Sequence, residues 1–343
     1  MYKSQISTGY LETPCYYRVM NTEVLKRLKN AGLLSEQAPD MGFVPTGSYA
    51  LNKIISGDYN KGIPIGMITQ FHGEASTAKT VFATHILKEA QEKGYYAMLV
   101  DSENAYNPTF AKHLGIDPDK LIYAAPETLE DCFQVITEAI VTIRQEDKDT
   151  PIVVAYDSIA VSPSKAEYEA ENYEGNNMQG AVRAKSTGAC LRKINPLMRK
   201  YKVALVIINQ IRNKVGVMYG SPDTMAAGGK SLEYYLGVNL KCISNKTSDL
   251  IKDDNKKVLG IQGKVRNTKN KVSVPFRECE FELVYNEGLN AYAGILPQLL
   301  TDGVIKQTGS WYSFGDFKFQ KKQFNEGFLI DEVFSELREE IGL

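Results

Sequence analysis

Residues 72–81, HGEASTAKTV, have the types and spacing needed to hold the phosphates of a nucleotide. Gly73, Lys79 and Thr80 fit the pattern G-x-x-x-x-G-K-[ST] of a phosphate-binding loop, but Ala78 stands where the second glycine belongs. In such a loop backbone N–H groups surround the phosphates, the lysine reaches the terminal phosphates and the hydroxyl binds Mg²⁺. The match by itself is also compatible with a chance glycine ahead of a Lys-Thr pair.

The surroundings of the loop favour a nucleotide site. The apolar run 67–71 predicts a strand that leads into the loop, and apolar residues at helical spacing over 79–94 predict a helix that starts from it. Asp157 ends another apolar strand, 152–158, where its carboxylate could share Mg²⁺ with the Thr80 hydroxyl. We therefore predict that ATP and Mg²⁺ are bound here. The predicted loop residues are Gly73, Glu74, Ala75, Ser76, Thr77, Ala78, Lys79 and Thr80.

Ala78 leaves two outcomes open. If its backbone is right-handed, the position needs only room for one methyl group. If its φ is positive, an alanine there costs about 1 kcal/mol, which weakens the site without abolishing it. A DNA-binding filament whose ATP site has decayed is therefore one alternative reading of the chain.

Glu103 is a candidate catalytic base. It follows the predicted strand YYAMLVD at 95–101, so it lies at the carboxyl edge of a parallel sheet, where open α/β sheets bind their ligands. A carboxylate at that edge could orient and polarise the water that attacks the γ-phosphate. The alternative is a surface glutamate that merely begins a loop.

The composition is that of a globular protein that does not enter membranes. Among 343 residues 43% are hydrophobic and 24% are charged, and the start of the chain lacks the apolar core of a signal peptide. Five scattered cysteines without a C-x-x-C pair suggest reduced thiols, so we expect a cytoplasmic protein. The net charge is −1, so any nucleic-acid binding must come from local basic patches.

Alternating strands and helices predict an α/β fold. Predicted strands at 67–71, 95–101, 152–158 and 203–211 alternate with predicted helices at 79–94, 127–145 and 181–200. Short apolar runs that alternate with helices indicate a mostly parallel sheet covered on both faces.

Two further parts flank this core. Residues 1–45 are predicted to be an N-terminal oligomerisation segment, with a short amphipathic helix from Thr22 to Gly32 whose apolar side must be buried on its own core or on a neighbouring subunit. The core then spans 46–285, and 286–343 form a small α+β C-terminal domain that closes with a helix near 328–341.

Two long segments and one basic run are candidates for binding nucleic acid. Residues 169–186 and 210–231 are rich in glycine and small residues, and long loops in compact domains are usually functional. Basic and aromatic side chains on such loops suit contacts with a phosphate backbone and with bases. The run 262–277 adds five basic residues and no acidic one, although a charge run is often only a solvated face.

Several stretches together resemble the RecA family of bacterial recombinases. They are INQIRNKVGVMYGSPDTMAAGGKSLEYY, DSEN, YDSIAVSPSKAE, KNKVSVPFRECEFELVYNEGLNAYAGIL and GSWYSFG, in unbroken order over about residues 45–320. VRAKSTGACLRKI and the non-glycine residue before Lys79 are more similar to the UvsX branch that phages encode. The resemblance implies a RecA-type P-loop ATPase core and a helical filament on single-stranded DNA, with ATP held between subunits.

The resemblance also implies roles around the nucleotide. Asn107 and Phe110 match positions that face and stack on the adenine. Gln210 matches the residue that senses the γ-phosphate, and Glu103 and Lys79 match catalytic positions. Lys269 and Lys271 match a pair that reaches the ATP of the neighbouring subunit.

For DNA, the resemblance implies contacts from residues 169–180 and 211–229 and from the basic run. Lys264 and Arg266 match positions proposed for the second DNA strand, Arg183 and Lys185 compete for one basic role, and Asn239 replaces a usual arginine. The full predicted DNA-binding set is Met178, Arg183, Lys185, Arg192, Arg212, Lys214, Val215, Gly216, Tyr219, Gly228, Gly229, Lys264 and Arg266.

These residues predict an ATP-dependent recombinase that pairs single-stranded DNA with homologous duplex DNA in recombination and repair. The implied partners are the two DNA molecules and further copies of the chain, with room for single-strand-binding and mediator proteins. The alternative from another class is a RecA-fold DNA helicase, a motor that translocates and does not exchange strands.

Overall fold

The computed structural model describes residues 22–31, 40–170, 179–213, 224–226, 229–245 and 248–343. The chain divides into two units, Met1–Asp40 and Met41–Leu343. The described part of the first unit contains helix α1 (Thr22–Asn30), with Glu23 in its first turn and Arg27 and Lys29 in its last. These charges complement the helix dipole. The helix end predicted at Gly32 lies outside the described residues.

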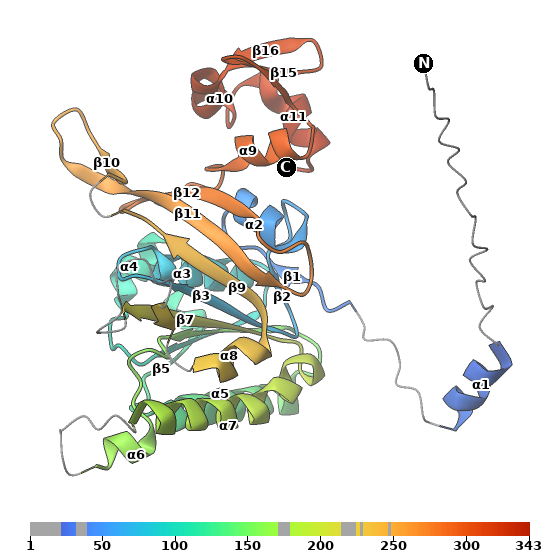
Figure 1. The fold of residues 1–343 in the computed structure, drawn as a ribbon, viewed down its shortest axis with the longest axis vertical. Coiled ribbons are helices and arrows are strands. Elements are labelled where there is room, and N and C mark those ends of the chain that lie inside the picture. Colours follow the sequence, from blue (N-terminus) through green and yellow to red (C-terminus); the bar gives the residue numbers. More distant parts are fainter. Residues whose placement is uncertain (1–21, 32–39, 171–178, 214–223, 227–228, 246–247) are drawn as a thin grey trace, which may run out of the picture. The chain divides into compact units, whose positions relative to one another are not determined.

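A mostly parallel sheet forms the centre of the second unit (Figure 1). Its strand order is β13-β12-β11-β9-β3-β7-β6-β4-β5, and the neighbouring pairs from β9 to β5 are all parallel. This confirms the predicted fold class. The six parallel strands are β3 (Ile68–Gly73), β4 (Tyr96–Asp101), β5 (Leu121–Ala124), β6 (Ile152–Asp157), β7 (Val203–Asn213) and β9 (Leu236–Ile243).

Antiparallel strands extend the sheet beyond β9. They are β11 (Val258–Asn270), β12 (Glu278–Val284) and β13 (Gly288–Leu289), with β10 (Leu250–Lys252) paired to β11 and β8 (Thr224–Ala226) paired to β7. Strand β11 therefore runs opposite to β9, which fixes where its basic residues lie. A separate pair, β1 (Phe43–Val44) with β2 (Ile63–Pro64), precedes the sheet.

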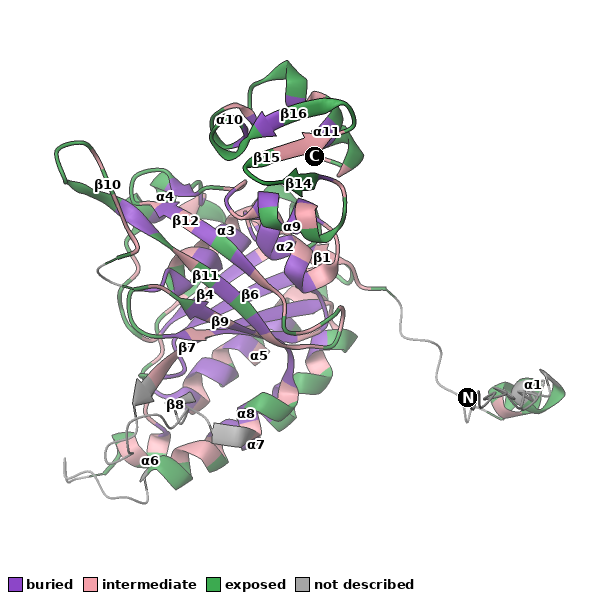
Figure 2. Ribbon diagram, turned by 45° about the horizontal axis from the view of Figure 1, so that its top comes forward, coloured by how far each residue is buried: buried purple, intermediate pink, exposed green. Residues whose placement is uncertain are grey.

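Helices cover both faces of the sheet because alternate residues of each strand point to opposite faces. Val153 and Ala155 belong to a buried cluster with α2 (Tyr49–Ser56) and α3 (Lys79–Glu92). Val154 and Tyr156 belong to a second cluster with α5 (Leu129–Glu146), α7 (Gln179–Lys200) and α8 (Gly229–Tyr235). Figure 2 shows the strands buried between these layers, while α5 and α7 expose one side. Within the described residues, no helix has both the length and the apolar character that a membrane crossing requires.

Buried amides link three strands beneath the loop. The Gln70 side chain of β3 donates to Asn239 of β9 at 2.9 Å and accepts from Asn209 of β7 at 3.0 Å. Asn239 replaces the arginine that the resemblance leads one to expect, and here it pairs with a neutral amide. Buried polar groups require such partners, so these bonds fix the register around the loop.

The C-terminal residues form a small module with its own apolar cluster, which includes Phe319, Phe324 and Phe334. The predicted helix over 328–341 is wrong in extent. The chain turns after Gly327, and Asp331 accepts from the Val333 N–H at 3.0 Å to begin a new short helix. The elements are α9 (Ile295–Thr301), β14 (Lys306–Thr308), β15 (Trp311–Phe314), β16 (Phe317–Gln320), α10 (Lys321–Gly327), η2 (Glu332–Phe334) and α11 (Ser335–Glu340).

Candidate nucleotide-binding and catalytic site

The predicted phosphate loop connects β3 to the N-terminus of α3. Gly73 is required by packing, because a Cβ there would lie 2.4 Å from the Cys242 carbonyl oxygen of β9. Ala78 precedes α3 without a side-chain cap. The N-terminus of α3 directly follows the loop, and the helix dipole favours negative charge there.

The loop holds its lysine in place. Lys79 is 6% exposed, and its Nζ donates to the Glu74 carbonyl oxygen and to Thr77 Oγ1 at 3.3 Å. The Thr77 hydroxyl donates to the same Glu74 carbonyl at 2.9 Å. The cation is thus kept at the loop, from which it can turn to a bound phosphate.

Thr80 and Asp157 meet as the sequence predicts. The Thr80 hydroxyl donates to Asp157 Oδ2 at 2.6 Å. Burial raises the pKa of Asp157 to about 6, with smaller contributions from Glu103 and Asp101, while the Thr80 bond opposes the shift. A buried carboxylate beside a hydroxyl offers the oxygen ligands that Mg²⁺ prefers. Charge from the ion would offset the cost of burying the carboxylate.

Glu103 lies at the same site. Its Oε1 accepts from the Ser158 hydroxyl at 2.6 Å and from Gln210 Nε2 at 3.1 Å. Glu103 and Ser158 follow β4 and β6, and Gln210 lies near the end of β7. These three strands are neighbours in the sheet. Parallel strands bring their carboxyl ends to one edge, which is why residues more than 100 positions apart share one carboxylate oxygen. Glu103 is exposed and begins a turn after β4, so its role as a catalytic base stays a prediction that these contacts support.

Asp101 is a buried residue that the sequence reading did not single out. Its carboxylate accepts from the backbone N–H groups of Glu103 at 3.1 Å and Tyr106 at 2.9 Å, and from the Tyr123 hydroxyl at 3.2 Å. These bonds shape the turn that carries Glu103. An aspartate at a strand end followed by a short polar turn was the available signal.

A cavity of about 460 Å³ adjoins the loop. Phe110 of α4 (Pro108–His113), which is 41% exposed, lines it together with Glu103, Asp157 and Gln210. Asn107 instead caps α4, since its side chain accepts from the Phe110 N–H at 3.1 Å. The antiparallel strands complete the wall with Ile261, Leu283 and the half-exposed Tyr285, which the sequence reading missed. The full lining is Ala75, Ser76, Thr77, Ala78, Lys79, Thr80, Val81, Glu103, Phe110, Asp157, Ile208, Gln210, Ile261, Leu283 and Tyr285.

Ala78 adopts the left-handed backbone, with φ 64° and ψ 13°. Of the two outcomes left open by the sequence, the strained one is therefore realised. Ser76 has the same φ of 64°. The loop keeps the shape that glycine would take without strain, and alanine there costs about 1–2 kcal/mol.

We predict that Ala78→Gly raises the free energy of unfolding by about 0.5–1 kcal/mol, because relief of strain outweighs the lost burial of one methyl group. Ala75→Gly is the matched control, since Ala75 lies in the same loop outside the left-handed region and should lose about 0.5–1 kcal/mol. Denaturant unfolding of both variants measures the difference. Equal losses in the two variants would contradict the strain.

Lys269 and Lys271 lie away from the loop of their own chain: Lys269 is opposite Asn239 of β9, which pairs with Gln70 of β3, and Lys271 lies two residues further from the loop. The Lys271 N–H donates to Gly237, near the start of β9, and β9 runs parallel to β3. The loop of the same chain is therefore about 10 Å from Lys269 and about 15 Å from Lys271 along the strand direction and about 10 Å across from both, beyond the reach of a lysine. Lys269 Nζ donates to the Glu233 carbonyl, and burial together with Lys271 lowers the pKa of Lys269.

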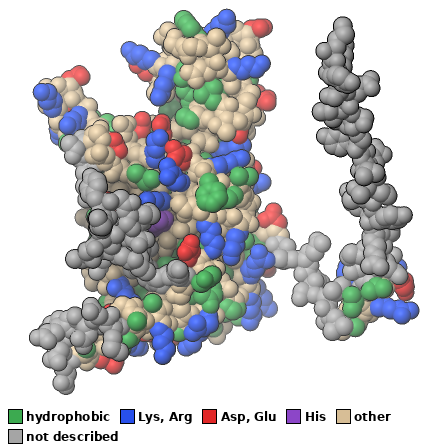
Figure 3. Space-filling view, viewed as in Figure 1, with side chains coloured by type: hydrophobic (Ala, Val, Ile, Leu, Met, Phe, Trp, Pro, Cys, Tyr) green, Lys and Arg blue, Asp and Glu red, His purple; other side chains and the backbone are tan. Residues whose placement is uncertain are grey.

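Lys264 and Arg266 share one acidic partner. Both form ion pairs with Glu278 of β12, Lys264 at 3.3 Å and Arg266 at 2.9 Å. The hydrogen bond from the Arg266 side chain contributes most to lowering the pKa of Glu278. Figure 3 shows basic side chains interspersed with acidic ones over this face of the molecule. A second DNA strand would have to compete with Glu278 for these two cations.

The described basic residues of α7 differ in what they contact. Arg183 donates to the carbonyls of Ile159 at 2.8 Å and Ala160 at 2.5 Å, which anchors the start of α7 to the end of β6. Lys185 and Arg192 are exposed. Gly229 begins α8. Met178, Lys214, Val215, Gly216, Tyr219 and Gly228 lie outside the described residues, and so does the Arg212 side chain.

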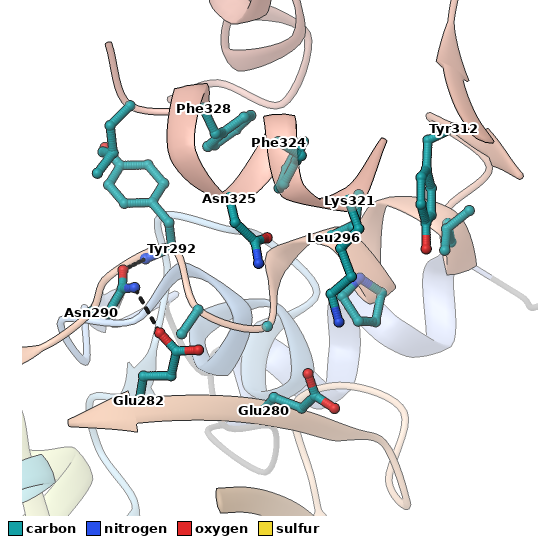
Figure 4. A pocket seen from close by; sticks show the side chains of 15 residues that line it. Glu280, Glu282, Asn290, Tyr292, Leu296, Tyr312, Lys321, Phe324, Asn325 and Phe328 are labelled. Atoms are coloured by element: carbon teal, nitrogen blue, oxygen red, sulfur yellow. Dashed lines mark hydrogen bonds between the residues drawn. The ribbon is translucent and has the colours of Figure 1, made fainter. Parts of the chain in front are cut away.

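A second cavity of about 200 Å³ lies between β12 and α10 (Figure 4). Glu280 and Glu282 project into it from the strand, and Lys321 and Phe324 project from the helix. Glu282 accepts from the Asn290 amide at 3.1 Å. The cavity lies between the C-terminal module and the core, and none of the predicted site residues lines it.

Comparison with known proteins agrees with the geometry. The RecA N-terminal domain family matches residues 27–290. The chain belongs to the RecA family. It is 36% identical over 307 residues to Protein RecA of Aquifex aeolicus, which covers 88% of this chain and 84% of that protein. It is 37% identical over 284 residues to Protein RecA of Symbiobacterium thermophilum, covering 82% and 76%.

Membership of the RecA family confirms the recombinase prediction. The chain is an ATP-dependent recombinase and a DNA-dependent ATPase, so the helicase alternative and the decayed ATP site are not favoured. RecA proteins bind DNA and form filaments, and the same holds for this chain in general terms. A phage-type UvsX origin stays a prediction.

Proposed function

We propose that this RecA-family chain assembles head to tail on single-stranded DNA, binds MgATP between adjacent copies, and carries out pairing and strand exchange with homologous duplex DNA. The hydrogen bond from Gln210 to Glu103 is the observation that most supports this proposal. Gln210 lies beside Gly73 in the register of β3 and β7, and β7 continues into the segment predicted to contact DNA. A change of partner at Gln210 would therefore act on both the nucleotide and the DNA segment.

The chain's own residues divide the work at the ATP site. Lys79 and the first turn of α3 bind the β- and γ-phosphates, and Phe110 and Tyr285 flank the base in the adjoining cavity. Thr80 and Asp157 hold Mg²⁺, which when bound neutralises phosphate charge. Glu103 orients the attacking water and accepts its proton.

Lys269 and Lys271 complete the site from the next copy. The two lysines lie beyond reach of the loop of their own chain, so an interface that sets this part of one copy against the loop of the next brings them to the phosphates. Such a heterologous contact repeats and gives a helical filament. Exposed Tyr234, Val274 and Phe276, at 75%, 57% and 78%, supply apolar contact area on the segments next to these lysines. The apolar side of α1 adds a docking element for a neighbouring copy.

DNA binding would come from residues around the two predicted segments. Exposed Lys185 and Arg192 are better placed for phosphate contacts than Arg183, whose guanidinium is engaged with backbone carbonyls. Contacts with phosphates are sequence-tolerant, so base pairing between the DNA strands would supply the sequence recognition. Single-strand-binding and mediator proteins are further partners that we propose.

The test is strand exchange between circular single-stranded DNA and a homologous linear duplex, with and without ATP. We expect joint molecules and exchanged products that require ATP, and their loss in the Lys79→Ala variant. Electron micrographs of the same mixtures should contain filaments on the single strand. Rings around DNA with unwinding of the duplex, and no exchange, would support the helicase alternative instead.

A further inference from the structure

We propose that Ser158 is the positioning residue for the catalytic base: its buried hydroxyl holds the Glu103 carboxylate in place when Gln210 turns to the nucleotide. The inference rests on the proposed role of Glu103 in ATP hydrolysis. It assigns a part in catalysis to a residue that follows the magnesium-side Asp157 in the sequence.

The two donors to Glu103 differ in strength. Ser158 lies 2.6 Å and Gln210 3.1 Å from the same Oε1 atom. A hydroxyl within 2.5–2.7 Å of a carboxylate makes a charge-assisted bond, which is stronger than one from a neutral amide at longer range. When the two compete for one oxygen, the amide is the partner that leaves at lower cost.

Ser158 itself is firmly held. It has no exposed surface. Its N–H donates to Ser102 Oγ at 3.1 Å. Its carbonyl accepts from the hydroxyls of Ser102 at 2.9 Å and Ser162 at 3.2 Å. The next residue, Ile159, donates its N–H to Ile208 of β7 at 3.1 Å. A donor fixed directly after a central strand can orient a flexible side chain that it contacts.

Glu103 needs such a holder because its own surroundings are open. It is exposed and stands on a short turn after β4, and Asp101 fixes the backbone of that turn but leaves the glutamate side chain free to rotate. A base that must lie within hydrogen-bond distance of the attacking water gains rate from preorganisation. Ser158 supplies it from the end of the adjacent strand β6, which it directly follows, and the effect should appear in kcat and not in ATP binding.

The experiment measures steady-state ATP turnover on single-stranded DNA for full-length Ser158→Ala. We expect kcat to fall about 10-fold and the KM for ATP to change by less than about 3-fold, since the hydroxyl acts on the base and not on the substrate. Ser158→Thr, which keeps the hydroxyl, should recover most of the turnover. Ser164→Ala is the matched control, because Ser164 is an equally buried serine whose hydroxyl donates to Glu167 and not to Ser158 or Glu103, so turnover should stay near the wild-type value.

A double-mutant cycle with Glu103→Gln separates positioning from a structural role. In the Glu103→Gln background, Ser158→Ala should change kcat by less than about 2-fold, because the two residues act as one unit. Equal losses in both backgrounds would overturn the proposal. If Ser158→Ala fails to fold, Ser158→Cys keeps the volume with a weaker donor and should lose turnover to a similar extent; wild-type turnover in a folded Ser158→Cys chain would overturn the proposal as well.

The same cycle distinguishes this inference from the proposed function. If Glu103→Gln has little effect on turnover, Glu103 is not the base and the proposed mechanism fails. If Glu103→Gln is strongly impaired while folded Ser158→Ala is as active as the wild type, only the positioning role of Ser158 fails.

Discussion

Joint replacement of Lys269→Ala and Lys271→Ala is expected to lower DNA-stimulated ATP turnover at least about 100-fold, because two cations that face the transferred phosphoryl group are removed. The fold should remain, since both residues lie at the end of β11 outside the buried clusters. Lys252→Ala with Lys257→Ala is the matched control. It removes the same charge from exposed positions beside the β10–β11 turn.

A mixing experiment tests whether the lysines act on a neighbouring copy. A Lys79→Ala chain has a defective loop and intact lysines, and the double variant has the opposite defects. In a random 1:1 head-to-tail copolymer, about a quarter of the interfaces join an intact loop to intact lysines, so turnover should rise from near zero to about a quarter of the wild-type value. Turnover no greater than the sum of the separate variants would contradict a shared site.

Glu103→Gln is expected to lower kcat for ATP hydrolysis by about 100-fold or more, because a neutral amide cannot accept the proton of the attacking water. ATP binding and filament formation should persist, since glutamine has the same size and can still accept from Ser158. Turnover on single-stranded DNA and filament length in electron micrographs measure the two effects.

Two further variants serve as controls for Glu103→Gln. Glu138→Gln removes the same charge from the exposed side of α5 and should leave turnover unchanged. Glu103→Asp keeps the charge but withdraws the carboxylate, so it should lie between glutamine and the wild type. A loss of less than about 3-fold in Glu103→Gln would assign the base to another group.

The sequence by itself determined the parts of the site that depend on short stretches. An apolar strand, a glycine, a lysine and a hydroxyl predicted the loop between β3 and α3, and an apolar strand ending in Asp157 predicted its partner. Both signals are reliable because a parallel strand buried on both faces is an apolar run, and its polar end must lie at the sheet edge. The same reasoning predicted Glu103.

Only the tertiary structure decided the groups that come from distant strands. Tyr285 reaches the cavity beside the loop through antiparallel pairing with β11, and Ser158 reaches Glu103 because β6 lies between β4 and β7. Glu278 forms ion pairs with Lys264 and Arg266, two residues of a run that contains no acidic residue of its own. The register between β11 and β12, and not the spacing in the sequence, makes these residues neighbours. The helix over 328–341 was wrong because a local cap at Asp331 interrupts an apolar pattern that looks continuous.

Ala78 shows the difference between what the sequence determines and what the tertiary structure determines. The sequence stated the cost of each backbone conformation there but could not choose between them. The choice is made by the loop as a whole, which passes through left-handed Ser76 and Ala78 between β3 and α3. A residue pattern reports the backbone conformation and burial that each position favours within a few residues of the chain. Strand order and register depend on contacts between residues far apart in the chain, so the conformational preferences of single residues do not determine them.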